Sequence, residues 1–292
     1  MAVVSEDPQK QLDWEARQRP RAGIAAIVAV LTLIGGFWGN VQVGNDAPTP
    51  SGLEALQRGV RPGPVNDLPS LQIPRMQYIV DHQALLLVLG VVGLIAGIAA
   101  GWALGFLAVA TRARRPELKR WVIYLPIVGG VLSGLYTLLG IVGEVVHDNQ
   151  VLDSGRTVAD AAKGNGLLVF ANALGFFALI ASAGAYVLVS LNAMRAGLLT
   201  RLLGVVGIGT GVFFILPLPL FGPLLQVLFQ AALALLLFRA WMGGIPPAWD
   251  TGRAEPWPAR QPAPRRGAPK PEPTPQPAGP AAPERRKRKK RH

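Results

Sequence analysis

The sequence predicts an all-α integral membrane protein: a bundle of six transmembrane helices followed by a disordered tail rich in Pro and Arg. Half of the 292 residues are hydrophobic, and they gather in six apolar stretches between Ala22 and Trp241. A transmembrane helix needs about 20 predominantly apolar residues. Residues 88–110 and 121–143 contain no charged side chain. Finally, 24 of the 29 Lys and Arg residues fall in segments that six spans would place on one side of the membrane.

This charge bias predicts the orientation and the cellular location. Loops rich in Lys and Arg remain in the cytoplasm when a membrane protein inserts. Only five basic residues fall on the opposite side: Arg58, Arg61, Arg75, Arg156 and Lys163. We therefore expect a multi-pass protein of the bacterial cell (inner) membrane with both termini in the cytoplasm.

The first elements are a polar cytoplasmic segment, residues 1–21, and a first span, residues 22–41. The polar segment is long and contains acidic residues, and no small-x-small cleavage site follows the apolar stretch closely, so we expect an uncleaved anchor. Residues 10–19 predict a short surface helix whose Leu12 and Trp14 contact lipid headgroups.

An outside segment, residues 40–83, follows the first span. Ser51 and Glu54 have capping-box spacing, which predicts a short helix over residues 51–59 on the membrane surface. We expect the rest of this segment to be extended because of four prolines: Pro62, Pro64, Pro69 and Pro74.

The later spans follow the same pattern. They are predicted at residues 84–111, 121–146, 166–191, 202–217 and 223–241, with a second outside segment at residues 147–165. Trp121 and Tyr124 are expected to anchor one span at the membrane interface. Residues 242–292 have too few aliphatic side chains to offset chain entropy by burial, so we expect a disordered cytoplasmic tail.

Several function classes lack support in the sequence. The chain has no cysteine, which excludes disulfides, thiolate nucleophiles and Cys-ligated metals. It has no phosphate-binding loop and no Gly-x-Ser-x-Gly motif. No Lys, Arg or Asp lies in the middle of a predicted span, which argues against a proton-coupled pump or a voltage sensor. We predict no cofactor and no catalytic residue, and we favour a non-enzymatic structural or interaction protein.

A glycine ridge is the sharpest packing signal. Gly93, Gly97, Gly101 and Gly105 recur every four residues in the second span, so they lie along one face of a helix. Such a face lets another backbone approach closely. The ridge predicts a close helix contact, either inside this bundle or in a homo-oligomer.

Five ionisable residues cluster at the predicted outer face and support an alternative, a metal- or haem-binding redox protein. They are Asp81 and His82, before the second span, and Glu144, His147 and Asp148, at the end of the third. Carboxylates and imidazoles are metal ligands, and two histidines can hold a haem iron. The competing interpretation is a set of solvated helix ends.

Neutral polar residues within the spans support another alternative, a small-solute transporter or channel. Gln226 and Gln230 lie one turn apart in the sixth span, and Asn172 lies in the fourth. These three residues either line a polar path or form hydrogen bonds between helices.

The tail ends in a basic run: Arg285, Arg286, Lys287, Arg288, Lys289, Lys290 and Arg291. Each such charge near an anionic leaflet contributes about 1 kcal/mol. The run is expected either to bind anionic lipid headgroups or an acidic cytoplasmic partner, or merely to keep the C-terminus inside. We expect no specific binding of nucleic acid.

Two segments carry a resemblance to a known group of proteins. They are the predicted inside loop, residues 191–204, and the exit from the last span, residues 246–252. With the Pro/Ala/Arg tail, they resemble polytopic six-span membrane proteins of actinobacterial type that have no assigned activity. The resemblance implies an inner-membrane location and transfers no functional residue.

Overall fold

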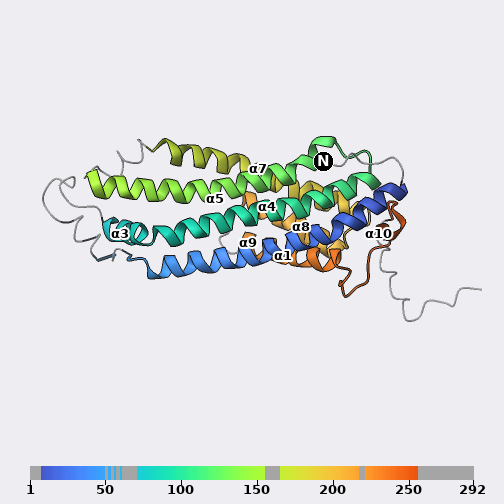
Figure 1. The fold of residues 1–292 in the computed structure, drawn as a ribbon, viewed down its shortest axis with the longest axis horizontal. Helices are drawn as coiled ribbons and strands as arrows, with labels where there is room; N and C mark the ends of the chain where they lie inside the picture. Colours follow the sequence, from blue (N-terminus) through green and yellow to red (C-terminus); the bar gives the residue numbers. More distant parts are fainter. Residues whose placement is uncertain are drawn as a thin grey trace, which may run out of the picture. The chain divides into compact units, whose positions relative to one another are not determined.

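The computed structural model is helical, and no strand occurs in the part of the chain that it describes, residues 8–49, 52–53, 56, 60, 71–154, 165–216 and 221–255. These residues lie in one compact unit, Met1–Trp257. Figure 1 shows its helices: α1 (Pro8–Asp46), α3 (Ile73–Asp81), α4 (Gln83–Arg114), α5 (Arg120–Ser154), α7 (Gly166–Arg195), α8 (Arg201–Ile215), α9 (Phe221–Leu237) and α10 (Ala248–Thr251).

Four helices are long and apolar enough to cross a membrane: α1, α4, α5 and α7. The prediction of an all-helical, multi-pass membrane protein is therefore confirmed at this level. The two remaining apolar helices, α8 and α9, are shorter, with 15 and 17 residues. At about 1.5 Å per residue they are about 22 and 26 Å long, whereas the hydrocarbon core of a bilayer is about 30 Å thick.

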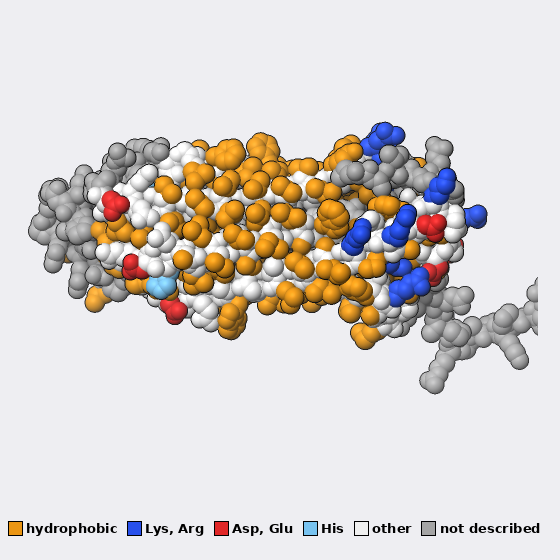
Figure 2. All heavy atoms as spheres, viewed as in Figure 1, with side chains coloured by type: hydrophobic (Ala, Val, Ile, Leu, Met, Phe, Trp, Pro, Cys, Tyr) orange, Lys and Arg blue, Asp and Glu red, His pale blue; other side chains and the backbone are white. Residues whose placement is uncertain are grey.

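Charged side chains gather at the two ends of the bundle, and hydrophobic side chains cover its middle (Figure 2). Exposed apolar residues of the middle include Ile24, Leu31, Trp38, Trp102 and Phe177. We call the end that carries Arg114 and α10 the basic end, and the end that carries α3 and Glu144 the acidic end. This distribution matches a protein whose middle lies in lipid.

The first helix corrects two expectations. A polar surface helix and a separate first span were predicted, but α1 is one continuous helix of 39 residues. Trp14 does not point to lipid headgroups, because its ring stacks on Phe106 of α4 at 5.7 Å. The side chain of Leu12 lies beside Gly252. The start of α1 is therefore part of the protein's own packing at the basic end.

The segment before α4 corrects another expectation. Pro74 was predicted to keep the chain extended, but it lies in the first turn of α3. Proline fits there because the first turn of a helix does not use its backbone N–H groups. Met76 and Ile79 of α3 are buried, with Val151 and Val145 of α5 respectively in their clusters. The predicted helix at 51–59 falls mostly outside the described residues, as do Pro62, Pro64 and Pro69.

The six apolar helices form a closed ring in which each contacts the next in the order α1, α4, α5, α7, α8, α9 and back to α1. The pair α8 and α9 thus stands between α1 and α7. In Figure 1 this pair lies along the half of the bundle nearer α10 and does not extend as far as α3. The largest buried hydrophobic cluster lies in the same half, where Leu107, Val189 and Phe229 are all fully buried.

Candidate functional site

A cavity of about 540 Å³ lies among the helices, and all six apolar helices contribute to its lining. On α4 the lining extends from Leu89 to Leu104. The contributions of α1 include Gly36, Phe37 and Asn40. Drug-sized ligands occupy cavities of about 300–1,000 Å³, so this cavity is large enough for a ligand.

The short hairpin of α8 and α9 explains why this space is empty. In the basic half the pair fills the gap between α1 and α7, and Phe229, Leu233 and Leu236 of α9 are fully buried there. Of α8 and α9, only Phe214 and Gln226 reach the cavity; Phe214 lies at the end of α8, and Gln226 lies near the start of α9. Beyond the end of α8 and the start of α9, no helix of the described part of the chain lies between the faces of α1 and α7.

Small residues enlarge the cavity from the side of α4 and α5. Gly93, Gly97 and Gly101 of α4 and Gly130 of α5 all line it. The same glycines bring the two backbones together, because a Cβ atom added at Gly97 would meet the backbone of Gly130 and lie 2.8 Å from the amide nitrogen of Gly134. The ridge that the sequence singled out thus lies against α5 of the same chain. Gly105 lies further along this seam, against Ile127.

Most hydroxyl groups of the lining already have hydrogen-bond partners. Thr32 and Thr137 donate to backbone carbonyls one turn earlier in their own helices, at 2.6 and 3.0 Å. Ser133 of α5 and Ser182 of α7 share a hydrogen bond of 3.1 Å across the helix interface. These hydroxyls therefore make the cavity only weakly polar.

A stronger polar group lies at the deep end of the cavity, where α7 meets α9. The amide of Gln230 donates to the hydroxyl of Tyr186 at 2.9 Å, and Tyr186 also interacts with Gln226. Gln230 is fully buried, and its Oε1 atom has no hydrogen-bond partner. Buried polar groups are nearly always paired, so this unpaired acceptor behind the cavity wall is an exception.

Of the three residues predicted to form a polar path, the structure places Gln226 and Asn172 in the cavity lining and Gln230 behind it. The sequence reasoning missed Tyr186 and the contribution of α1. A tyrosine within an apolar span gives no local signal of its role, and α1 reaches the site only through contacts with helices far away in the sequence.

No charged side chain and no histidine occurs among the described residues that line the cavity. Its rim is exposed: Phe37 on α1 and Phe176 on α7 are 43% and 61% exposed, and Tyr136 on α5 is 43% exposed. The cavity is therefore open on the side where α1 and α7 face each other.

The structure does not gather the five ionisable residues at the acidic end into one cluster of metal ligands. In the described part of the chain no group of three or more His, Asp or Glu side chains is placed to hold a metal ion. The His82 ring binds the carbonyl of Tyr78 and stacks on the Tyr78 ring. Asp81 and Glu144 are exposed. His147 and Asp148 are buried, and each has an unpaired polar atom. Because nothing joins them into a ligand set, we do not propose a metal or haem site.

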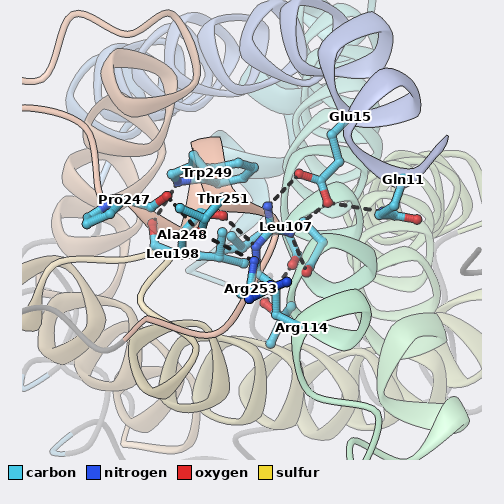
Figure 3. Close-up of polar contacts among 12 residues, drawn as sticks. Gln11, Glu15, Leu107, Arg114, Leu198, Pro247, Ala248, Trp249, Thr251 and Arg253 are labelled. Carbon is cyan, nitrogen blue, oxygen red and sulfur yellow. Dashed lines mark hydrogen bonds and ion pairs between the residues drawn. The ribbon is translucent and has the colours of Figure 1, made fainter. Parts of the chain in front are cut away.

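The basic end holds a buried ion pair that the sequence analysis did not identify. Arg114, at the end of α4, makes two parallel hydrogen bonds to the carboxylate of Glu15 on α1, at 2.6 and 2.9 Å. The two side chains are 0% and 4% exposed. Arg114 also donates to the carbonyls of Ala110 and Ala248 (Figure 3).

Trp249 fixes the exit segment to the same place. Its indole N–H donates to the carbonyl of Leu198, and its ring stacks on Phe106 and lies under the guanidinium of Arg19 (Figure 3 shows the indole beside Leu198). The two segments that carried the resemblance therefore pack against each other. Residues 242–292 were predicted to form a disordered tail, but residues 242–255 belong to the folded unit, because burial of Trp249 supplies an apolar contact that composition alone did not reveal. The terminal basic run, Arg285 to Arg291, lies outside the described residues.

No protein family, no curated protein and no solved structure matches this chain.

Proposed function

We propose that this chain is a six-span, non-enzymatic protein of the cell membrane that binds an uncharged molecule in its central cavity. The observation that carries the proposal is the cavity itself: about 540 Å³, open at mid-bundle, with amide and hydroxyl groups but no charged group among its described lining residues. An uncharged ligand needs no counter-charge, and charges are expensive inside a membrane.

Six spans are supported by the ring of contacts, in which α8 and α9 complete the bundle between α1 and α7. With about 22 and 26 Å of helix, this pair reaches most of the way across a core of about 30 Å. Both termini then lie on one side, and the excess of Lys and Arg at the basic end supports the cytoplasmic side. Labelling of a single cysteine at Leu216→Cys by a membrane-impermeant maleimide tests whether the hairpin reaches the far surface.

Ligand binding is tested by thermal unfolding of the protein in mild detergent, with a panel of neutral water-soluble solutes and a panel of neutral lipids. At 100 times its dissociation constant a ligand stabilises the protein by about 2.7 kcal/mol, so a bound compound raises the melting temperature measurably.

Two neighbouring glycines on α1 supply a matched pair of variants. Gly36 lines the cavity, and a Cβ atom added there lies 3.8 Å from Val92, so Gly36→Leu fills the cavity without a clash. Gly35 faces open space, so Gly35→Leu leaves the cavity intact. Stabilisation by a ligand is expected to be lost in Gly36→Leu and kept in Gly35→Leu. If no compound stabilises the wild type, or if both variants respond alike, the proposed function is wrong.

A further inference from the structure

We propose that the ligand is a neutral lipid of the bilayer that enters sideways between α1 and α7. Its hydrogen-bonding head lies at Tyr186 and Gln226, and its hydrocarbon chain leaves through the opening. This inference rests on the proposed function, because it names the occupant of the same cavity.

The route follows from the ring of helices. α1 and α7 are separated by α8 and α9 in the basic half, and beyond the hairpin they face each other across the cavity. Phe37 and Asn40 of α1 and Asn172 and Phe176 of α7 all line the cavity, and the partial exposure of Phe37 and Phe176 puts the opening between these two helices. Tyr136, on α5 behind them, remains exposed. The opening is therefore lateral, and its edges are two helices of the membrane domain.

The surface around the opening is the lipid-facing surface. Beside the rim, Ile34 and Trp38 on α1 and Phe177 and Ile180 on α7 are all at least half exposed. At the helical rise of about 1.5 Å per residue, Phe37 lies about 24 Å from Arg21 at the basic end and about 14 Å from Asp46 at the acidic end. The rim thus lies within the apolar belt, where the neighbouring solvent is hydrocarbon.

The length of the cavity suits a hydrocarbon chain. Its lining on α4 extends from Leu89 to Leu104, which corresponds to about 22 Å of helix. A hydrocarbon core of about 30 Å leaves about 15 Å for each leaflet. The cavity is therefore long enough for one hydrocarbon chain to lie along it from the deep end to the opening.

The deep end of the cavity suits an uncharged polar head. Tyr186 and Gln226 both line it, while the carbonyl oxygen of Gln230 has no partner behind them. Hydroxyl and amide groups bind alcohol or ester groups, and no described lining residue offers a charge that would pair with a phosphate or carboxylate head. The geometry points to a lipid whose head is a free hydroxyl or an ester, such as a diacylglycerol.

Because the chain has no cysteine, a single introduced cysteine can be spin-labelled specifically in the full-length protein. The test uses two variants, Phe37→Cys and Trp38→Cys, and each carries one label. Phe37 lines the cavity, whereas its neighbour Trp38 is 63% exposed and does not. The two proteins are reconstituted in phosphatidylcholine vesicles, and dioleoylglycerol or glycerol is added. These probes share a hydroxyl head, and only dioleoylglycerol has hydrocarbon chains.

Molecular oxygen partitions into hydrocarbon, whereas a water-soluble nickel chelate stays in the aqueous phase. We therefore expect oxygen to increase the spin relaxation of both labels and the nickel chelate to leave it unchanged. Dioleoylglycerol is expected to lower the oxygen accessibility of the label at position 37 at least twofold and to leave the label at position 38 unchanged. Gln226→Leu, which removes one hydrogen bond to the head, is expected to raise the required dioleoylglycerol concentration about fivefold. Tyr186→Phe serves the same purpose if Gln226→Leu does not accumulate.

Three results would overturn the inference: a label at position 37 that the nickel chelate relaxes more than oxygen, an effect of glycerol without an effect of dioleoylglycerol, or no effect of dioleoylglycerol. The proposed function survives the second result, since a water-soluble solute would then occupy the cavity. It fails separately if no compound distinguishes Gly36→Leu from Gly35→Leu.

Discussion

The two halves of the bundle share four long helices but differ in packing: the basic half is filled, and the acidic half is hollow. In the basic half, six apolar helices, the start of α1 and the exit segment after α9 fill the interior, and Arg114, Glu15 and Trp249 bind them together. Towards the acidic end the hairpin of α8 and α9 has ended, and a cavity lies among the helices there; only its deep end, lined by Leu104 and Tyr186, reaches the packed cluster of the basic half. The basic half is therefore mostly close-packed, whereas the bundle is hollow beyond the hairpin.

A short helix pair can therefore create a cavity without any special residue. Interiors of proteins are normally close-packed. Here the cavity exists because α8 and α9 end before they reach the acidic end, and not because reactive side chains cluster there. If this comparison is right, substitutions in the basic half should affect stability strongly, whereas those in the cavity should mainly affect binding.

The largest effect is expected from removing the carboxylate of the buried ion pair. Glu15→Ala leaves the guanidinium of Arg114 buried without its counter-charge, which costs about 3–5 kcal/mol of unfolding free energy. Unfolding in mild detergent measures this loss. The control is Asp250→Ala, which breaks the exposed pair of Asp250 with Arg239 and should cost about 0–1 kcal/mol. Equal losses in the two variants would show that the basic end is not held by Arg114.

The seam between α4 and α5 should give the next largest effect. Gly97→Leu places a side chain against the backbone of α5 at Gly130 and Gly134, and neither backbone can yield without separating the helices. We expect a loss of about 2–3 kcal/mol, the upper range for overpacking a core. Gly140→Leu on α5 is the matched control, because no atom lies within 4 Å of a Cβ added there. Equal stability of the two variants would contradict the close contact.

The sequence predicts the four long helices well because apolar side chains without charged interruptions are a property of each segment alone. The periodic glycines likewise indicate a close contact, although only the structure identifies α5 as the partner. Glu15 and Arg114 are 99 positions apart, and neither differs locally from an ordinary charged residue at a helix end. Trp249 was assigned to the tail because its burial depends on Leu198 and Phe106.

The cavity could be predicted only in part for the same reason. Its polar residues on the fourth and sixth spans are visible in the sequence, whereas its volume depends on the lengths and positions of six helices. The last two spans were predicted at residues 202–217 and 223–241, which are already short. Only the structure shows that this pair lies between α1 and α7, and this position determines where the bundle is hollow.

A smaller effect is expected from Trp249→Phe. This change keeps an aromatic ring over Phe106 but removes the hydrogen bond of 3.0 Å to the carbonyl of Leu198. The buried carbonyl then lacks this donor, and we expect a loss of about 1–2 kcal/mol of unfolding free energy. Phe176→Leu at the cavity rim, which is 61% exposed, should stay within about 0.5 kcal/mol of the wild type. A larger loss of unfolding free energy in Phe176→Leu than in Trp249→Phe would show that the half with the cavity, and not the basic half, contributes more to stability.

The smallest effects separate two buried serines of α7. Ser182, which lines the cavity, shares a hydrogen bond with Ser133, and such bonds between membrane helices are worth about 0.6 kcal/mol, so Ser182→Ala should lose about that much. Ser190 lies in the basic half, fully buried, with no partner for its hydroxyl. Ser190→Ala removes an unpaired polar group and should leave the unfolding free energy unchanged or raised. A larger loss of unfolding free energy in Ser190→Ala than in Ser182→Ala would contradict this prediction, because the Ser190 hydroxyl would then have to make a stabilising hydrogen bond in the basic half.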